Sequence, residues 1–259
     1  MESFSKSLHL MGNLFTLTVV SEDPEFAQEN IEIAIAEIQR IEALFTTYTT
    51  ESQTHLINEN AGIQPVKVDR EVFDLIQRSL HISKITQGAF DLSYGSIDKS
   101  LWNFDATMTQ LPSTATALKM VHLIDYTNII LDEKGPTVFL KEVGMRIGFG
   151  GIGKGYAAEM AKKLLVRNGV KSGIINASGD LTTWGSQANG KPWTIGIANP
   201  NVPKNAFSYL EISNKAVATS GNYEKFVTIK GKKYSHTIDP KTGLPITGIK
   251  SVTVISTNA

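Results

Sequence analysis

The chain has 259 residues, with 25 basic and 25 acidic side chains, so its formal net charge of zero does not favour nucleic acid as the main partner. It contains no cysteine, which excludes disulfides, thiolate metal sites and a cysteine nucleophile. No apolar run reaches the roughly 20 residues of a membrane span, and no signal peptide is visible in the first ten residues.

The front of the chain is rich in helix patterns. Residues 8–20 alternate like a strand around Met11-Gly12, where the glycine suggests a bulge or a close backbone approach. Apolar side chains at three- and four-residue spacing then predict helices over 24–45, over 70–88 and, more briefly, after Ser113. The polar residues 46–60 between the first two helices predict a loop.

Residues 88–105 follow no period. They mix aromatic, acidic and glycine residues, which is typical of either a packed loop or the wall of a ligand site. Short apolar runs separated by turn residues then predict strands over 128–131, 137–141 and 145–149.

A glycine-rich loop comes next, and the rest of the chain is organised around it. Five glycines fall between positions 148 and 155, with Lys154 among them. A helix pattern follows as far as Gly169, and a strand pattern over 173–177 ends at Ser178-Gly179-Asp180. Because glycine lets the backbone approach an anion closely, we interpret this loop as a phosphate or diphosphate site. The alternative is a turn that only packs a helix tightly on a sheet.

Two general nucleotide-binding patterns fit the loop imperfectly. Residues 148–153 match G-x-G-x-x-G of dinucleotide-binding folds, but almost only strand patterns follow Asp180, where such a fold needs further alternating helices. Residues 148–154 also match G-x-x-x-x-G-K, yet Gly155 stands where a P-loop needs Ser or Thr. We therefore predict an α+β fold, helix-rich in its first half and strand-rich in its second.

His236 is the candidate base. It precedes an Asp-Pro-x-x-Gly turn at a strand end, where an imidazole can accept a proton near neutral pH. Taken alone, a histidine that merely braces the turn is the simpler interpretation. The hydroxyl-rich residues 218–223 are equally open, either as donors to a phosphate or as a solvated turn.

In this order, the pieces resemble the FAD:protein FMN transferases, the ApbE-like flavin transferases. The resemblance covers nearly the whole chain and rests on Met11-Gly12, Phe45–Tyr48 with Asn58, Gly88–Asp91 before Trp102, Gly151–Ala157, Ser178–Asp180, Thr219–Gly221, Ser235–Pro240 and Thr242-Gly243.

The resemblance implies an enzyme that uses FAD and Mg²⁺ to attach FMN, through a phosphoester, to a Ser or Thr of an acceptor flavoprotein, releasing AMP. His236 matches the histidine that activates the acceptor hydroxyl, and Gly151 matches a main-chain metal ligand. The implied FAD contacts are Met11, Tyr48, Ala89, Phe90, Asp91, Gly148, Lys154 and Ile238.

Some expectations concern the limits of the chain. We expect one flavin transferase domain over residues 1–259, without the C-terminal helix that holds the family's other metal ligands. The family is commonly exported, so we expect a place at the cell envelope, with membrane attachment only through a leader absent from this sequence. An FAD-binding protein or metal-dependent FAD pyrophosphatase of the same fold is an alternative, and an NAD(P)-dependent oxidoreductase is a more distant one.

Overall fold

The computed structural model describes residues 1–100, 108–221 and 226–259, without the side chains of residues 203 and 204. These residues divide into two compact units, each assembled from separate parts of the sequence. Unit 1 comprises Met1–Ala43, Ile152–Tyr223 and Lys250–Ala259, and unit 2 comprises Leu44–Gly151 and Glu224–Ile249. Trp102 and Tyr223, which the sequence analysis singled out, lie outside the described residues.

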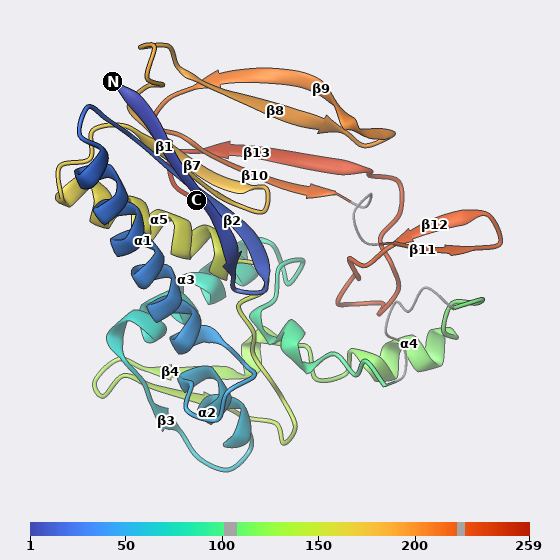
Figure 1. The fold of residues 1–259 in the computed structure, drawn as a ribbon. Helices are drawn as coiled ribbons and strands as arrows, with labels where there is room; N and C mark the ends of the chain where they lie inside the picture. Colours follow the sequence, from blue (N-terminus) through green and yellow to red (C-terminus); the bar gives the residue numbers. More distant parts are fainter. Residues whose placement is uncertain (101–107, 222–225) are drawn as a thin grey trace. The chain divides into compact units, whose positions relative to one another are not determined.

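Unit 1 is built on a six-stranded sheet in which every neighbouring pair is antiparallel (Figure 1). Its strands, in spatial order, are β1 (Glu2–Leu10), β2 (Asn13–Ser21), β6 (Gly173–Ala177), β7 (Asp180–Trp184), β10 (Ala216–Gly221) and β13 (Ser251–Ser256). The helices α1 (Pro24–Phe45) and α5 (Gly153–Arg167) cover one face, and the hairpin of β8 (Trp193–Asn199) and β9 (Val202–Ile212) covers the other. A dinucleotide-binding fold needs parallel strands, so this sheet contradicts the oxidoreductase alternative.

The strand alternation explains these layers. Phe15, Leu17 and Val19 of β2 are fully buried on the helix side, while Val20 on the opposite side joins an apolar cluster with Trp193 and other side chains of the hairpin. The helices supply the matching apolar stripes, so the core of unit 1 lies on both faces of the sheet.

Met11-Gly12 proves to be a hairpin turn between β1 and β2, so the expected single strand with a bulge is wrong. Both residues adopt left-handed backbone conformations, with φ of 51° and 69°, as in the tight turns that match the twist of a hairpin. Ser178-Gly179 forms a similar turn between β6 and β7. Because β2 pairs with β6, the two turns lie at the same end of the sheet.

Unit 2 combines short helices with a small sheet and a hairpin. The three-stranded sheet has the order β3-β5-β4, and β11 pairs with β12. Its elements are α2 (Gln53–Glu59), β3 (Val66–Lys67), α3 (Arg70–Ile85), the 3₁₀ turns η1 (Leu92–Ser96) and η2 (Tyr126–Asn128), α4 (Thr114–Met120), β4 (Ile129–Asp132), β5 (Thr137–Leu140), β11 (Phe226–Ile229) and β12 (Lys232–Ser235).

Two expectations for unit 2 are wrong. Residues 46–60 contain α2, because the Ser52 hydroxyl caps the helix by accepting a hydrogen bond from His55 N at 3.0 Å. Residues 145–149 form no strand and pair with none of the described strands. Their backbone instead bonds to side chains of α2 and η1: Ile147 N donates to Asn58 Oδ1, and Arg146 N donates to Ser96 Oγ, each at 2.8 Å.

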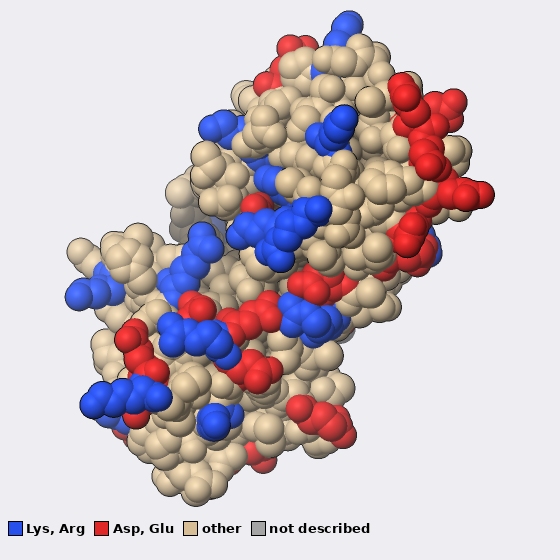
Figure 2. All heavy atoms as spheres, turned by 90° about the vertical axis from the view of Figure 1, so that its left-hand side faces the viewer, with Lys and Arg blue, Asp and Glu red and all other residues tan. Residues whose placement is uncertain are grey.

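The described residues contain no helix long and apolar enough to cross a membrane. Figure 2 shows small groups of acidic and of basic side chains on the face that it presents.

Candidate active site

Unit 2 contains a cavity of about 500 Å³ that brings together three distant parts of the sequence. One part is the glycine loop, the second is the aperiodic segment before and within η1, and the third is the strand end after β12. Seven predicted site residues line it: Ala89, Phe90, Asp91, Gly148, Gly151, His236 and Ile238. The imidazole of His236, the predicted base, therefore lines the same cavity as the glycine loop, the predicted diphosphate site.

The glycine-loop wall of this cavity is held from behind by a buried amide. Asn58 accepts a hydrogen bond from Ile147 N and donates one to Ile147 O, at 2.8 and 3.1 Å. Gly95 packs against the backbone of the same residue, because a Cβ built there would come within 2.9 Å of the Ile147 carbonyl carbon. Gly95 and Ser96 are not among the residues predicted from the sequence, where their only signal is a Gly-Ser pair inside the aperiodic segment.

The loop glycines leave open space inside the cavity. Neither Gly148 nor Gly150 has a left-handed φ, so neither backbone conformation requires glycine. Among the described atoms, a Cβ on Gly150 would meet nothing within 4 Å, and a Cβ on Gly148 would meet only the Gly95 Cα, at 3.9 Å. The missing side chains therefore leave room beside the loop backbone, as an anion-binding loop needs, although the N–H of Gly148 already donates to Leu92 O at 3.2 Å.

Asp91 shapes the opposite wall. Its Oδ1 accepts hydrogen bonds from the N and Oγ of Ser93, at 2.8 and 2.6 Å, and its Oδ2 accepts one from Tyr126 N at 3.0 Å. Burial raises the pKa of this carboxyl above the usual 3.8, although these hydrogen bonds act in the opposite direction. The Asp91 carboxylate, which the sequence predicts to contact a ligand, thus already binds the turns η1 and η2 of the protein itself.

His236 is placed by the register of β12 and by the turn that follows. His236 directly follows the last residue of β12, in a bend, and is exposed, whereas Ser235 before it is buried. The turn is anchored at Gly243, whose φ is 68° and where a Cβ would come within 2.1 Å of the Ala117 carbonyl oxygen of α4. Ile238 is buried in the apolar cluster that joins this segment to α4 and β11. The backbone that carries His236 is therefore held by the packing of Gly243 and Ile238.

Tyr48 lies beside a second cavity of unit 2, of about 560 Å³. The two cavities share part of their lining, including Gly95 and Gly148. Arg146 also lines the second cavity. Tyr48 is 95 % exposed.

Met11 and Lys154 belong to unit 1. Met11 sits in the β1–β2 turn with an unusual left-handed backbone for a residue with a side chain, and Asn13 Nδ2 donates to its carbonyl oxygen at 2.8 Å. Lys154 lies in the first turn of α5, where its Nζ pairs with Asp180 Oδ2 at 3.1 Å. This ion pair joins the start of α5 to the start of β7.

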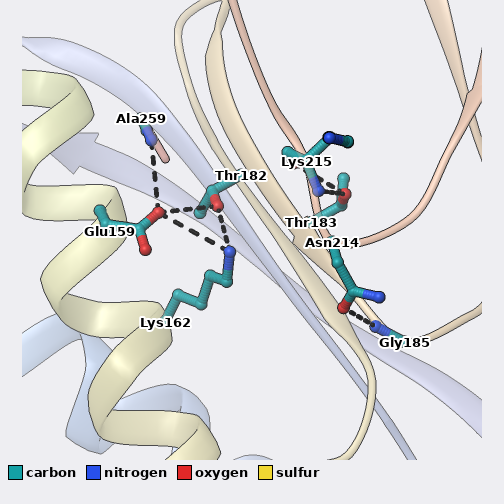
Figure 3. A network of polar contacts seen from close by, with 8 residues as sticks. All are labelled: Glu159, Lys162, Thr182, Thr183, Gly185, Asn214, Lys215 and Ala259. Atoms are coloured by element: carbon teal, nitrogen blue, oxygen red, sulfur yellow. Dashed lines mark hydrogen bonds and ion pairs between the residues drawn. The ribbon is translucent and has the colours of Figure 1, made fainter. Parts of the chain in front are cut away.

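Unit 1 also buries the carboxylate of Glu159, which no pattern in the sequence indicated (Figure 3). Glu159 Oε2 accepts a hydrogen bond from Thr182 Oγ1 at 3.1 Å and one from Ala259 N at 3.3 Å, and Lys162 Nζ lies 3.7 Å away. Lys162 also donates to Thr182 Oγ1 at 3.0 Å. These contacts fasten α5 to β7 and explain the buried charge without a ligand.

The described residues do not form a metal site by themselves. Among them, no three His, Asp or Glu side chains gather closely enough to hold an ion. The main-chain oxygen of Gly151 alone does not meet the six-oxygen coordination that Mg²⁺ prefers. The metal therefore stays a prediction from the resemblance.

Comparison with known proteins decides the family. A family model described as the ApbE family matches residues 11–259, which cross both units. The chain belongs to the ApbE family. A protein of Klebsiella pneumoniae named FAD:protein FMN transferase is 35 % identical over 258 residues, covering 99 % of this chain and 78 % of the relative. An Escherichia coli protein of the same name is 27 % identical, covering 96 % of this chain and 72 % of its own length.

Solved ApbE structures share the fold. The crystal structure of the ApbE protein from Thermotoga maritima superimposes with a TM-score of 0.89 at 28 % identity, covering 99 % of this chain and 82 % of that one. The apo form of the Pseudomonas stutzeri flavinyl transferase ApbE gives a TM-score of 0.83 at 25 % identity, covering 100 % and 81 %. The predicted α+β class, with helices early and strands late, is confirmed.

Proposed function

We propose that this chain is an FAD:protein FMN transferase that moves FMN from FAD onto a hydroxyl of an acceptor protein. The ApbE family and the names of the relatives support this enzyme class. The observation in the structure that carries the proposal is the cavity in which Gly148, Gly150 and Gly151 face the same space as His236.

The reaction needs a general base and a group that stabilises negative charge on the phosphate, and these residues can supply both. The acceptor oxygen forms a bond to the FMN phosphorus, while the bond from that phosphorus to the bridging diphosphate oxygen breaks and AMP leaves. His236 takes the proton of the attacking hydroxyl, which is a weak nucleophile without a base. Peptide N–H groups of the loop stabilise the negative charge on the phosphoryl oxygens.

The remaining cavity residues bind and orient the substrate in this proposal. Ala89, Phe90 and Ile238 offer an apolar wall against which an aromatic ring packs, and Asp91 keeps that wall in place through Ser93 and Tyr126. Met11, Tyr48 and Lys154 are proposed FAD contacts on the strength of the resemblance. Mg²⁺, when bound, would neutralise phosphate charge, and we propose Gly151 O as one of its ligands.

The proposal extends to partners and place. The acceptor is a flavoprotein that carries a target Ser or Thr, and the setting is the cell envelope, as the resemblance implies. The continuous family match over residues 11–259 supports a single family domain built from both units.

The test separates transfer from hydrolysis. The protein is incubated with FAD, Mg²⁺ and a flavoprotein subunit that carries a target threonine. We expect the acceptor to gain the mass of one FMN while an equal amount of AMP forms. AMP release without the mass gain would instead favour an FAD pyrophosphatase.

His236→Ala and His236→Gln locate the base. Both variants should lose transfer while the affinity for FAD, measured by flavin fluorescence, changes by less than about threefold, because the imidazole acts on the acceptor rather than on the flavin. Loss of FAD binding in both variants would make His236 a binding residue and remove the proposed base.

A further inference from the structure

One lysine lies where the two cavities of unit 2 adjoin. The cavity that holds His236 and the second cavity beside Tyr48 share four lining residues: Gly95, Ile97, Lys99 and Gly148. Of these four, Lys99 alone carries a charged side chain, and it is exposed. A positive charge therefore lies at the junction of the two cavities, at a position that no motif in the sequence indicated.

The backbone that carries Lys99 is attached to the rest of unit 2. Asp98 N donates a hydrogen bond to the carbonyl oxygen of Met120, the last residue of α4, at 3.0 Å. Asp98 Oδ1 in turn accepts hydrogen bonds from the N and the Oγ of Ser100, at 2.9 and 2.5 Å. Lys99 therefore lies between two residues whose polar groups have fixed partners.

The charge of Lys99 has no partner inside the cavities. Among the described residues, the acidic side chains that line them are those of Asp91 and Asp98. Asp91 binds the turns η1 and η2, and Asp98 binds Ser100, whose hydrogen bonds hold the pKa of the Asp98 carboxyl below the usual 3.8. Within the described part of the chain, Lys99 takes part in no ion pair, so its ammonium group is available to an anionic ligand.

The shape and the charge of FAD suit this arrangement. A negatively charged diphosphate joins its two ring systems, the isoalloxazine and the adenine. Adjoining cavities of about 500 and 560 Å³ offer each ring a separate place, and the diphosphate that connects the rings then passes the lining that the cavities share. At this passage Gly148 contributes open space beside the backbone, and Lys99 contributes a compact positive charge, which suits a phosphate oxygen.

We propose that Lys99 contacts the diphosphate of FAD and stabilises the charge that develops on the phosphate leaving as AMP. The inference rests on the proposed function and adds a catalytic residue to it. When the bond between the FMN phosphorus and the bridging oxygen breaks, that oxygen keeps the electron pair, and the proton of the acceptor hydroxyl passes to His236. The AMP phosphate thereby gains one negative charge. An ammonium group beside it stabilises this state more than it stabilises bound FAD, so Lys99 speeds the transfer as well as tightening binding.

A series of charges at position 99 tests the contact. FAD affinity is measured by flavin fluorescence, with Mg²⁺ present, for Lys99→Arg, Lys99→Gln and Lys99→Glu. The Gln variant should bind FAD about tenfold more weakly, because it loses one hydrogen bond between two charged groups. The Glu variant should bind still more weakly, because its carboxylate repels the diphosphate, whereas the Arg variant should stay within about threefold of the unaltered protein.

A second lysine of unit 2 provides the matched control. Lys67 of β3 is exposed and lines neither cavity, so Lys67→Gln and Lys67→Glu should bind FAD as the unaltered protein does. The midpoint of urea unfolding should be the same for the Lys99 and the Lys67 variants, because both side chains are exposed. A loss of FAD affinity that is confined to Lys99 then reports a local contact.

The rate of transfer tests the role in the reaction. With FAD and acceptor both saturating, Lys99→Gln should transfer FMN roughly 10- to 100-fold more slowly than the unaltered protein, and Lys99→Arg should keep most of the rate. The fold-loss should be constant between about pH 6 and 8, because a lysine ammonium stays charged throughout that range.

Two results would overturn the proposal. If Lys99→Gln binds FAD as tightly as Lys67→Gln does, Lys99 does not contact the diphosphate. If it binds FAD more weakly but transfers FMN at the full rate once FAD saturates, Lys99 does not stabilise the leaving phosphate. Either result, obtained while the unaltered protein transfers FMN, overturns the Lys99 proposal alone. If the unaltered protein binds FAD but transfers no FMN, the proposed function fails, and the affinity series still decides whether Lys99 contacts the diphosphate.

Discussion

Replacement of Gly150 by alanine separates a glycine kept for the fold from one kept for a ligand. Gly150 lines the cavity, has no left-handed φ, and offers no described atom within 4 Å of a new Cβ. Alanine should therefore fold at least as well as glycine. It should even stabilise the protein by about 0.4–1 kcal/mol, because it restricts the unfolded chain.

The same methyl group should weaken FAD binding. In the proposed site it would occupy the space through which a phosphate oxygen reaches the loop backbone, so at least one hydrogen bond to a charged group would be lost. Such a bond contributes about 1.5–3 kcal/mol, which corresponds to a loss of affinity of roughly 10- to 100-fold. Flavin fluorescence titration gives the affinity, and urea unfolding of the free protein gives the stability.

Two glycines of unit 2 provide controls. Gly135→Ala, in the turn between β4 and β5, also meets no described atom and has no left-handed φ, so it should leave affinity unchanged. Gly95→Ala should lower both quantities, because its Cβ would clash with the Ile147 backbone. If Gly150→Ala binds FAD as tightly as the unaltered protein, the loop does not hold the diphosphate and the proposed site is wrong.

Three further predictions concern single side chains. Asn58→Ala should lower the free energy of unfolding, measured in urea, by about 2–4 kcal/mol, because the N–H and C=O of Ile147 lose their Asn58 partner inside the protein. A decrease of less than about 1 kcal/mol would contradict the role of Asn58 in holding the loop. Lys154→Ala should weaken FAD binding about tenfold. The loss of stability should be small, because the partly exposed ion pair of Lys154 with Asp180 contributes at most about 1 kcal/mol. An unchanged affinity for FAD would show that Lys154 does not belong to the site. Burial raises the pKa of Asp91, so the folded protein binds the proton of this carboxyl more tightly than the unfolded chain does. The protonated carboxyl therefore contributes stability that is fully present below pH 3.8, the pKa in the unfolded chain. That contribution is lost as the pH rises through the higher pKa of the folded protein. Urea unfolding across this window should show that falling component, and its persistence in Asp91→Asn would assign the slope to another group.

Local patterns in the sequence determined most of the elements. The helix spacing located α1, α3 and α5, because their buried stripes recur with the helical period. The glycine loop and His236 each had a purely structural alternative, and only the order of several motifs along the chain, through the family resemblance, favoured a functional site. The predictions from local patterns were wrong for two segments. In residues 46–60 the Ser52 hydroxyl caps a helix where a loop was expected, and in residues 145–149 the Asn58 amide bonds to the backbone where strand pairing was expected.

Only the tertiary structure decided which of these residues share a cavity. Gly151 and His236 are 85 positions apart in the chain, and no local preference brings them together. Burial of Ile238 against α4 and the anchoring of Gly243 at Ala117 set the position of the imidazole, while Asn58 and Gly95 set that of the loop. The tertiary structure also showed that Asp91 binds the protein itself, because hydrogen-bond partners such as Tyr126, 35 residues away, have no signature in the sequence around a carboxylate.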